Sequence, residues 1–139
     1  MDYTNQQATK KFPPIPPEVE KTGKLCLNAA FKVHTALGPG LLESVYEQAL
    51  SYELLNQGLD VLTQKVLPIN YDGHLLDAGL RMDILVENCV VLELKAVEKM
   101  IPLYEAQLLT YLKLTNIRLG YLINFNVVKL KDGIKRRVV

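Results

Sequence analysis

Two charged residues stand two positions apart in an otherwise apolar segment near the middle of the chain. The segment VVLELKA, residues 90–96, has the length and aliphatic composition of a buried strand, yet it contains Glu93 and Lys95. Side chains of a strand alternate between its two faces, so Glu93 and Lys95 share one face. A carboxylate and an ammonium group placed side by side could hold a metal ion, a water molecule or a phosphate oxygen.

A second carboxylate is predicted to reach the same place from the preceding strand. In LRMDILV, residues 80–86, alternation puts Arg81, Asp83 and Leu85 on the polar face and leaves the core face to Leu80, Met82, Ile84 and Val86. A two-residue loop at 87–88 would pair Asp83 with Leu92, whereas a three-residue loop at 87–89 pairs Asp83 with Glu93. Only the longer loop keeps both apolar sets on one face, so we predict it, with Asn88 or its neighbour in the left-handed conformation.

Adjacent carboxylates repel each other, and without a cation one of them must hold a proton. A divalent ion removes this conflict, and carboxylate oxygens suit Mg²⁺ or Mn²⁺. The pattern of the two strands also allows a simpler structure, in which Glu93 and Lys95 lie on a solvated sheet face and Asp83 pairs with Arg81 or Lys95. The strands alone leave both interpretations open.

Polar residues at the borders of two predicted helices could complete such a site. On a helical wheel Glu43 lies at the edge of the apolar stripe of the second helix, and Glu53 projects nearer the centre of that stripe, as a rival for the same role or as its border. In a later helix Gln107 and Tyr111 are one turn apart on one face. Taken alone, an ordinary amphipathic border is the simpler explanation of these two residues.

The elements that must position these residues follow from periodicity and turn signals. The chain of 139 residues is 49% hydrophobic, enough for one domain. We expect a polar and proline-rich tail over residues 1–17 and one domain over residues 18–139. The domain is predicted to contain helices near 18–37 and 41–57, three strands within 59–96 with a hairpin turn at Asp72–Gly73, a helix at 101–116 and a strand at 118–128.

The formal net charge of +1 excludes a strong global basic field, so any phosphate-facing patch must be local. The basic ending, with Lys129, Lys131, Lys135, Arg136 and Arg137, could contact phosphates or form a solvated terminal strand. His34, near the end of the first helix, is typical of a residue that bonds terminal carbonyls, although a place in the site is the alternative. The sequence has neither a signal peptide nor an apolar run of about 18 residues, so we expect a soluble cytoplasmic protein without a membrane partner.

Four separated motifs together resemble a known group of enzymes. They are GLLESVY (40–46), RMD (81–83), ELK (93–95) and QLLTY (107–111), and they occur in the order found in the PD-(D/E)XK nuclease superfamily. Within it the chain is most similar to the bacterial GxxExxY proteins, whose name motif corresponds to Gly40, Glu43 and Tyr46. The resemblance extends from about Leu25 over essentially the whole predicted domain. It departs from the superfamily name at Met82, which stands where proline would precede Asp83.

The resemblance implies an α/β fold of the restriction-endonuclease type, a sandwich whose central mixed sheet of four or more strands is flanked by helices. It implies that Asp83 and Glu93, aided by Glu43, bind Mg²⁺ or Mn²⁺, and that Lys95 is the lysine of the ExK element. Gln107 would act beside them, with Tyr111 and Arg81 at the phosphate of the substrate; for Arg81 a salt bridge to the acidic pair is the alternative.

The resemblance also implies metal-dependent hydrolysis of phosphodiester bonds in nucleic acid, with DNA as the expected partner and DNA repair or processing as the expected role. A homodimer is compatible with so small a nuclease, although no sequence feature requires one. The competing interpretation is a catalytically idle fold of the same type that binds nucleic acid or protein.

Overall fold

The computed structural model describes residues 12–139, and residues 1–11 lie outside the described part. The expected tail of residues 1–17 therefore falls mostly outside it. In its described end the carbonyl of Pro14 accepts a hydrogen bond from Arg118 at 3.0 Å. The elements in chain order are α2 (Pro17–Leu37), α3 (Glu43–Asn56), β1 (Val61–Tyr71), β2 (His74–Val86), β3 (Val90–Lys95), α4 (Pro102–Thr115), β4 (Leu119–Asn124), the short 3-10 helix η1 (Leu130–Gly133) and β5 (Ile134–Val138).

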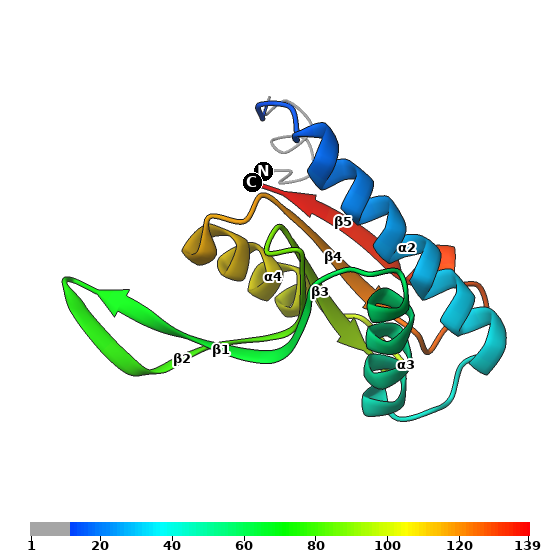
Figure 1. Cartoon of the computed structure of the whole chain (residues 1–139). Helices are drawn as coiled ribbons and strands as arrows, with labels where there is room; N and C mark the ends of the chain where they lie inside the picture. Colours follow the sequence, from blue (N-terminus) through cyan, green and yellow to red (C-terminus); the bar gives the residue numbers. More distant parts are fainter. Residues whose placement is uncertain (1–11) are drawn as a thin grey trace.

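The five strands form one mixed sheet in the order β1-β2-β3-β4-β5. Strand β3 runs parallel to β4, and the other neighbouring pairs are antiparallel. Helices α2 and α3 cover one face of the sheet and α4 covers the other, while the β1–β2 ribbon extends beyond the helices (Figure 1). The predicted α/β sandwich with a mixed sheet flanked by helices is therefore confirmed.

Local sequence signals set the ends of the helices. Helix α2 begins with Pro17 in its first turn, where the missing N–H costs nothing, and it ends at Gly38, whose φ of 70° lets its N–H reach the carbonyl of His34 at 2.8 Å. Helix α4 begins in the same way at Pro102 and ends at Asn116 in the left-handed conformation. No helix within residues 12–139 has both the length and the apolar character needed to cross a membrane.

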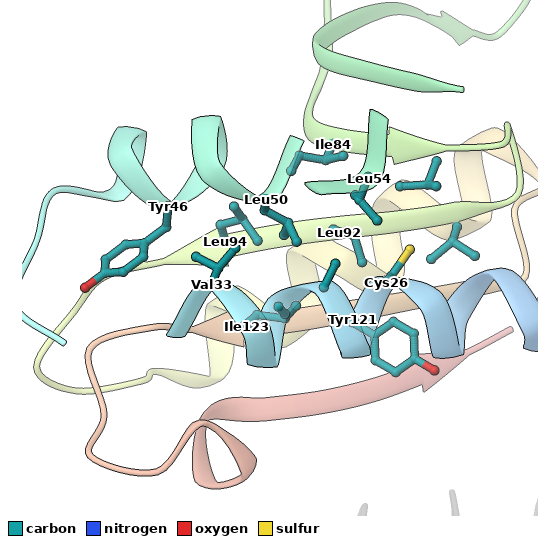
Figure 2. Packing of buried hydrophobic residues seen from close by; sticks show 14 of the residues in the cluster. Cys26, Val33, Tyr46, Leu50, Leu54, Ile84, Leu92, Leu94, Tyr121 and Ile123 are labelled. Carbon is teal, nitrogen blue, oxygen red and sulfur yellow. The ribbon is translucent and has the colours of Figure 1, made fainter. Parts of the chain in front are cut away.

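The larger core lies between the sheet and the α2/α3 layer. Figure 2 shows Cys26 and Val33 of α2 and Leu50 of α3 packed toward strand residues that include Leu92 and Ile123. Leu50 and Leu92 are fully buried. This core confirms the predicted apolar face of β3, formed by Val90, Leu92 and Leu94.

The opposite face of the sheet is also buried, as in a sandwich, although the strand pattern alone indicated a polar face there. Leu85 and Val91, expected on a polar face, are 2% and 0% exposed. They pack with Leu108 and Leu112 of α4 in a second core. The expectation of one core face was wrong because strand alternation shows which side chains share a face, but not whether a helix from elsewhere in the chain covers it.

Both predicted hairpin turns are confirmed. Tyr71 pairs with His74 across Asp72 and Gly73, which both have positive φ, as a type I′ hairpin requires. Val86 pairs with Val90 across the three-residue loop 87–89. Glu87 and Asn88 both take positive φ in that loop.

A further difference concerns the apolar side of β2. Ile84 packs in the α2/α3 core as predicted, but Met82 packs in the α4 core. The predicted single core face for residues 80–86 was therefore wrong at Met82, since regular alternation would keep Met82 and Ile84 together. The strand changes face at Asp83.

Candidate functional site

The Asp83 and Glu93 side chains meet where β2 and β3 part. The ladder pairs Ile84 with Leu92, so the register places Asp83 opposite Glu93. Beyond the Ile84–Leu92 pair, the side-chain carboxylates of Asp83 and Glu93 accept the hydrogen bonds that link the two strands. Oδ2 of Asp83 accepts the N–H of Leu94 at 2.8 Å, and Oε1 of Glu93 accepts the N–H of Asp83 at 3.2 Å. The structure therefore brings together the two acidic residues that the register argument paired.

Glu93 is buried, with only 5% of its surface exposed. Burial, followed by the charge of Asp83, raises the pKa of Glu93 to about 9, and the N–H of Asp83 and the charge of Lys95 only partly oppose this. Glu93 therefore holds a proton at neutral pH unless a cation takes its place.

Lys95 lies next to Asp83 and Glu93 but forms no salt bridge with either. Its Nζ lies 4.4 Å from the centre of the Tyr104 ring, in a cation–π contact. Among the ion pairs within residues 12–139, none involves Lys95. The ammonium group is therefore close enough to influence the Glu93 carboxyl and is still available to a water molecule or an anion.

The end of β3 that carries Lys95 is fixed by its neighbours. The carbonyl of Lys95 accepts the N–H of Phe125 at 2.9 Å. The buried amide of Asn124 donates to the carbonyl of Val97 at 2.9 Å and accepts its N–H at 3.1 Å. These bonds satisfy both backbone groups of Val97 and hold the segment that follows Lys95.

The motif at residues 40–46 brings Glu43 to the site. Gly40 has a φ of 97°, which a residue with a side chain rarely adopts, and the loop it allows leads directly into α3. The buried hydroxyl of Tyr46 donates to the carbonyl of Gly38 at 2.6 Å and accepts the N–H of Leu41 at 3.1 Å. Glu43 is the first residue of the helix. Burial, then the charge of Asp83, raises its pKa, and Lys95 opposes the shift.

Two residues of the site were missed from the sequence. Gln64 of β1 donates its Nε2 to both carboxylate oxygens of Glu47 at 3.0 Å and to Oδ1 of Asp83 at 3.4 Å. The position of Glu47 one helical turn after Glu43 was a usable signal, since residues four apart share a helix face. Gln64 gave none, because nothing in its neighbourhood distinguishes it from an ordinary strand residue.

Helix α4 contributes the predicted pair Gln107 and Tyr111. Nε2 of Gln107 donates to the Tyr111 hydroxyl at 2.9 Å. Burial and then the charge of Glu93 raise the pKa of Tyr111, and Asp83 adds to the effect. The Tyr111 hydroxyl is therefore oriented by Gln107 and lies within electrostatic reach of the acidic pair.

Within residues 12–139, the side chains of three other candidates form no hydrogen bond or ion pair with this group, which consists of Glu43, Asp83, Glu93, Lys95, Gln107 and Tyr111. Arg81 is exposed, and no ion pair of the described residues includes it, so the alternative of a salt bridge to Asp83 or Glu93 is not formed. Nε2 of His34 donates to the carbonyl of Val127 at 2.8 Å, a structural contact. Glu53 forms an ion pair with Lys32 at 2.9 Å and ties α3 to α2, so the rival role considered for it is not supported.

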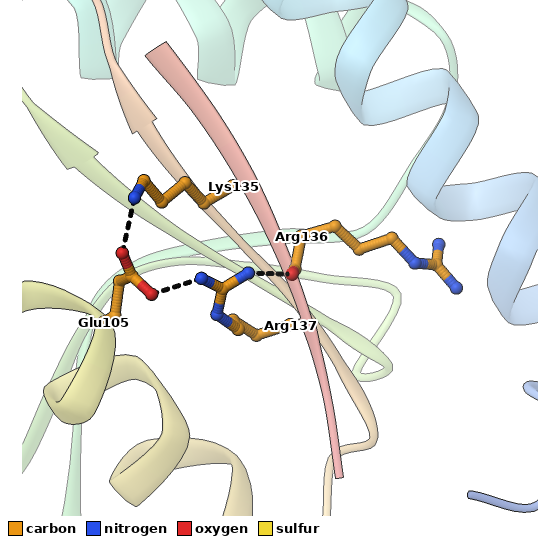
Figure 3. A network of polar contacts seen from close by, with 4 residues as sticks. All are labelled: Glu105, Lys135, Arg136 and Arg137. Carbon is orange, nitrogen blue, oxygen red and sulfur yellow. Dashed lines mark hydrogen bonds and ion pairs between the residues drawn. The ribbon is translucent and has the colours of Figure 1, made fainter. Parts of the chain in front are cut away.

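The basic ending is engaged in ion pairs rather than gathered into an open patch. Figure 3 shows Lys135 and Arg137 of β5 on either side of the Glu105 carboxylate of α4, with Lys135 at 2.6 Å. Arg136 points to the other side of the strand, where it pairs with Glu20 of α2 at 2.7 Å. Lys129 and Lys131 are exposed. Residues 135–137 therefore form a terminal strand whose charges are paired within the protein, rather than a patch open to phosphates.

The donor set fits a hard divalent cation of the kind that keeps part of its water shell. Asp83 and Glu93 adjoin each other, and Glu43 faces them from α3 closely enough to feel the charge of Asp83. Within residues 12–139 no three His, Cys, Asp or Glu side chains are gathered tightly enough to bind a metal ion unaided. Mg²⁺ typically uses one or two carboxylates together with water and substrate phosphates, so two close carboxylates and a third nearby suit it.

Comparison with models of known protein families gives a match. The family model of the PD-(D/E)XK nuclease superfamily matches residues 20–137. The chain belongs to the PD-(D/E)XK nuclease superfamily. No curated protein and no solved structure matches the chain.

Membership accounts for the fold and gives the acidic pair its context. Nucleases of this superfamily generally use divalent metal ions, and the expected ExK element corresponds to Glu93 and Lys95 at the end of β3. In place of the proline of the superfamily name, Met82 is fully buried in the α4 core. That position therefore serves packing in this chain.

Proposed function

We propose that this chain is a metal-dependent nuclease that hydrolyses phosphodiester bonds of nucleic acid, with DNA as its substrate in repair or processing. The observation that carries the proposal is the Asp83–Glu93 pair, in which Glu93 is buried and Asp83 half-buried, with Lys95 beside it. Burying one carboxylate beside another is costly, and a bound divalent cation offsets that cost. Membership of a nuclease superfamily supports the same function. The motif formed by Gly40, Glu43 and Tyr46 favours the GxxExxY proteins within it.

Each proposed role follows from the position of the residue. Asp83 and Glu93 bind Mg²⁺ or Mn²⁺, and Glu43 orients water around the ion from α3. A divalent ion held there supplies Lewis acidity toward a phosphoryl oxygen and lowers the pKa of a water molecule. Lys95 orients the attacking water or stabilises the negative charge that develops on the phosphate.

Substrate contacts come from α4 and from β2. Gln107 fixes the direction of the Tyr111 hydroxyl, which then donates to a phosphate oxygen of the strand being cut. Arg81, exposed and outside the ion pairs of the described residues, supplies a second phosphate contact. Because one domain covers little of a duplex, a homodimer would extend the contact to both strands.

A second candidate function is a binding module with the same fold and no chemistry. The near-neutral net charge favours it, since a nuclease that acts alone usually presents a more basic surface. The pairing of Lys135 and Arg137 with Glu105 further reduces the free positive charge. In this case the acidic pair would bind a cation or remain protonated, and nucleic acid would be bound without being cut.

Cleavage assays distinguish the two functions. We would incubate end-labelled and circular DNA, single- and double-stranded, and single-stranded RNA with Mg²⁺ or Mn²⁺. Wild type would be compared with Glu93→Ala and with Glu98→Ala, a matched change of an exposed glutamate five residues away. The nuclease predicts cutting by wild type and Glu98→Ala that is lost in Glu93→Ala. Equal cutting by folded Glu93→Ala would remove Glu93 from the scheme, and metal binding without cutting by wild type would favour the binding module.

A further inference from the structure

Both strands of the β1–β2 ribbon change face at one pair of positions. On β2, Ile84 packs in the α2/α3 core and Met82 packs in the α4 core. On β1, Thr63 borders a hollow against α3, whereas Lys65 lines a hollow of about 520 Å³ at the end of α4. Residues two apart in a regular strand share a face. The ribbon therefore turns over between these two pairs.

Gln64 is the residue at which β1 turns over. Thr63 pairs with Ile84 and Lys65 with Met82 in one continuous register, but the pair between them, Gln64 with Asp83, is absent from the ladder. Gln64 has a φ of 53°, a left-handed conformation that costs energy for a residue with a side chain. Such strain persists only where surrounding contacts enforce it, and here those contacts involve the acidic site.

The amide of Gln64 lies between two carboxylates. Its Nε2 is 3.0 Å from each oxygen of Glu47 and 3.4 Å from Oδ1 of Asp83. The other oxygen of Asp83 is held by the N–H of Leu94 at 2.8 Å. Each oxygen of Asp83 is thus held by a donor on a different neighbouring strand, and Glu47 is positioned by the same amide from the other side.

We propose that Gln64 is a positioning residue that orients the Asp83 carboxylate for the divalent cation, with Glu47 fixing the direction of the Gln64 amide. The inference rests on the proposed function, because it assigns Asp83 to the cation. The chain of contacts runs from Glu47 on α3 through Gln64 on β1 to Asp83 on β2. An amide suits the middle position, since its NH₂ group donates to both neighbours and adds no negative charge. Outer partners of this kind orient metal ligands and tune their affinity.

Gln64→Gly separates the role of the side chain from the strain of the backbone. Glycine adopts positive φ without steric cost, so this variant is expected to unfold at the same temperature as wild type or a higher one. Loss of the amide is nevertheless expected to weaken Mn²⁺ binding about tenfold in titration calorimetry. Glu47→Ala, which breaks the same link from its other end, is expected to lower Mn²⁺ affinity in the same direction. Thr63→Gly, the neighbouring control, should leave Mn²⁺ affinity unchanged.

Gln64→Glu keeps the shape of the side chain but replaces the donating NH₂ group with a carboxylate oxygen that accepts hydrogen bonds. The new carboxylate cannot donate to Glu47 or Asp83 and competes with them for protons, so the pH dependence of Mn²⁺ binding should change. The expected result is a midpoint that moves relative to wild type, while Gln64→Gly lowers affinity at every pH. Identical profiles for Gln64→Glu and wild type would contradict the inference.

Asp83→Ala serves as the reference that separates the two proposals. If Asp83→Ala loses Mn²⁺ binding and cleavage while Gln64→Gly retains both at the wild-type level, only the inference about Gln64 fails. If Asp83→Ala binds Mn²⁺ and cuts as wild type does, or if wild type does not bind Mn²⁺, the proposed function and the inference both fail. Loss of binding in Asp83→Ala with a tenfold loss in folded Gln64→Gly supports both.

Discussion

The carboxylate of Glu93 accepts a hydrogen bond from the backbone N–H of Asp83 at 3.2 Å, while the carboxylate of Asp83 bonds the neighbouring strand in return. The two side chains replace the ladder bonds that β2 and β3 would make if they stayed paired. This arrangement opens the sheet at one point and leaves two acidic groups there. The stability and metal binding of the protein should both depend on it.

The metal-free protein should lose stability as the pH rises from about 4 to about 9. The pKa of Glu93 is raised to about 9 in the folded protein by burial and by Asp83, whereas in the unfolded chain it is that of an ordinary carboxyl. The folded state therefore binds the extra proton throughout this interval, and the free energy of unfolding falls with pH by a total on the order of a few kcal/mol. Urea unfolding at several pH values measures this slope. Glu93→Gln should flatten it, and a slope unchanged in that variant would contradict the assignment.

Mn²⁺ affinity should increase with pH from neutrality toward 9. The cation must displace the proton that Glu93 holds, so binding becomes easier as that proton becomes easier to remove. Calorimetric titrations in buffers of different ionisation enthalpy should reveal about one proton released per ion near pH 7. Affinity that does not vary between pH 7 and 9 would show that Glu93 is not a ligand.

Tyr46→Phe should destabilise the loop that leads into α3. The lost hydroxyl bonds the carbonyl of Gly38 and the N–H of Leu41, and its removal breaks both of these part-buried hydrogen bonds. We expect a loss of about 1–3 kcal/mol in the free energy of unfolding, together with lower activity, because Glu43 follows this loop directly. Tyr52→Phe is the matched control, since Tyr52 lies on the same helix and is 64% exposed. Equal stability of the two variants would contradict the prediction.

Leu108→Ala should test the second core under α4. Leu108 is fully buried against side chains that include Leu85 and Val91. Truncation should cost about 2–5 kcal/mol in the free energy of unfolding, measured by urea denaturation. Leu103→Ala, on the same helix at 67% exposed, should cost about 0.5 kcal/mol or less. A small effect at Leu108 would mean that α4 does not seal this face.

Glu105→Gln should have a small effect with the opposite pH dependence to that of Glu93. Burial opposes the shift, but hydrogen bonds to Lys135 and Arg137 hold the pKa of Glu105 below its usual range. Its contribution is therefore present at neutral pH and lost as the pH falls through the lowered pKa. Because the side chain is only half-buried and solvent screens the pair, we expect at most about 1 kcal/mol, decreasing with added salt. Thermal unfolding of both proteins over a series of pH values from 7 downward checks this, and a difference that does not decrease as the pH falls would contradict it.

Part of the site could be predicted from the sequence because its determinants are local. The spacing of Glu93 and Lys95 fixes their shared face, and the apolar pattern on either side of residues 87–89 selects the loop that brings Asp83 opposite Glu93. Gly40 likewise marks the loop that precedes α3, and Pro102 marks the first turn of α4. These features depend on strand period, turn chemistry and helix termination, which neighbouring residues determine.

Other features were decided only by the tertiary structure. Alternation predicted that Met82 and Ile84 share a face, and it could not show that the ribbon turns over between them, because the positive φ of Gln64 goes against the preference of that residue type. Contacts with Glu47 and Asp83 offset that cost, and they come from distant parts of the chain. The burial of Leu85 beneath α4 and the pairing of Arg137 with Glu105 have the same origin. The sequence by itself determined which residues could act together, and packing between distant segments decided their orientation and which of them remained free to do chemistry.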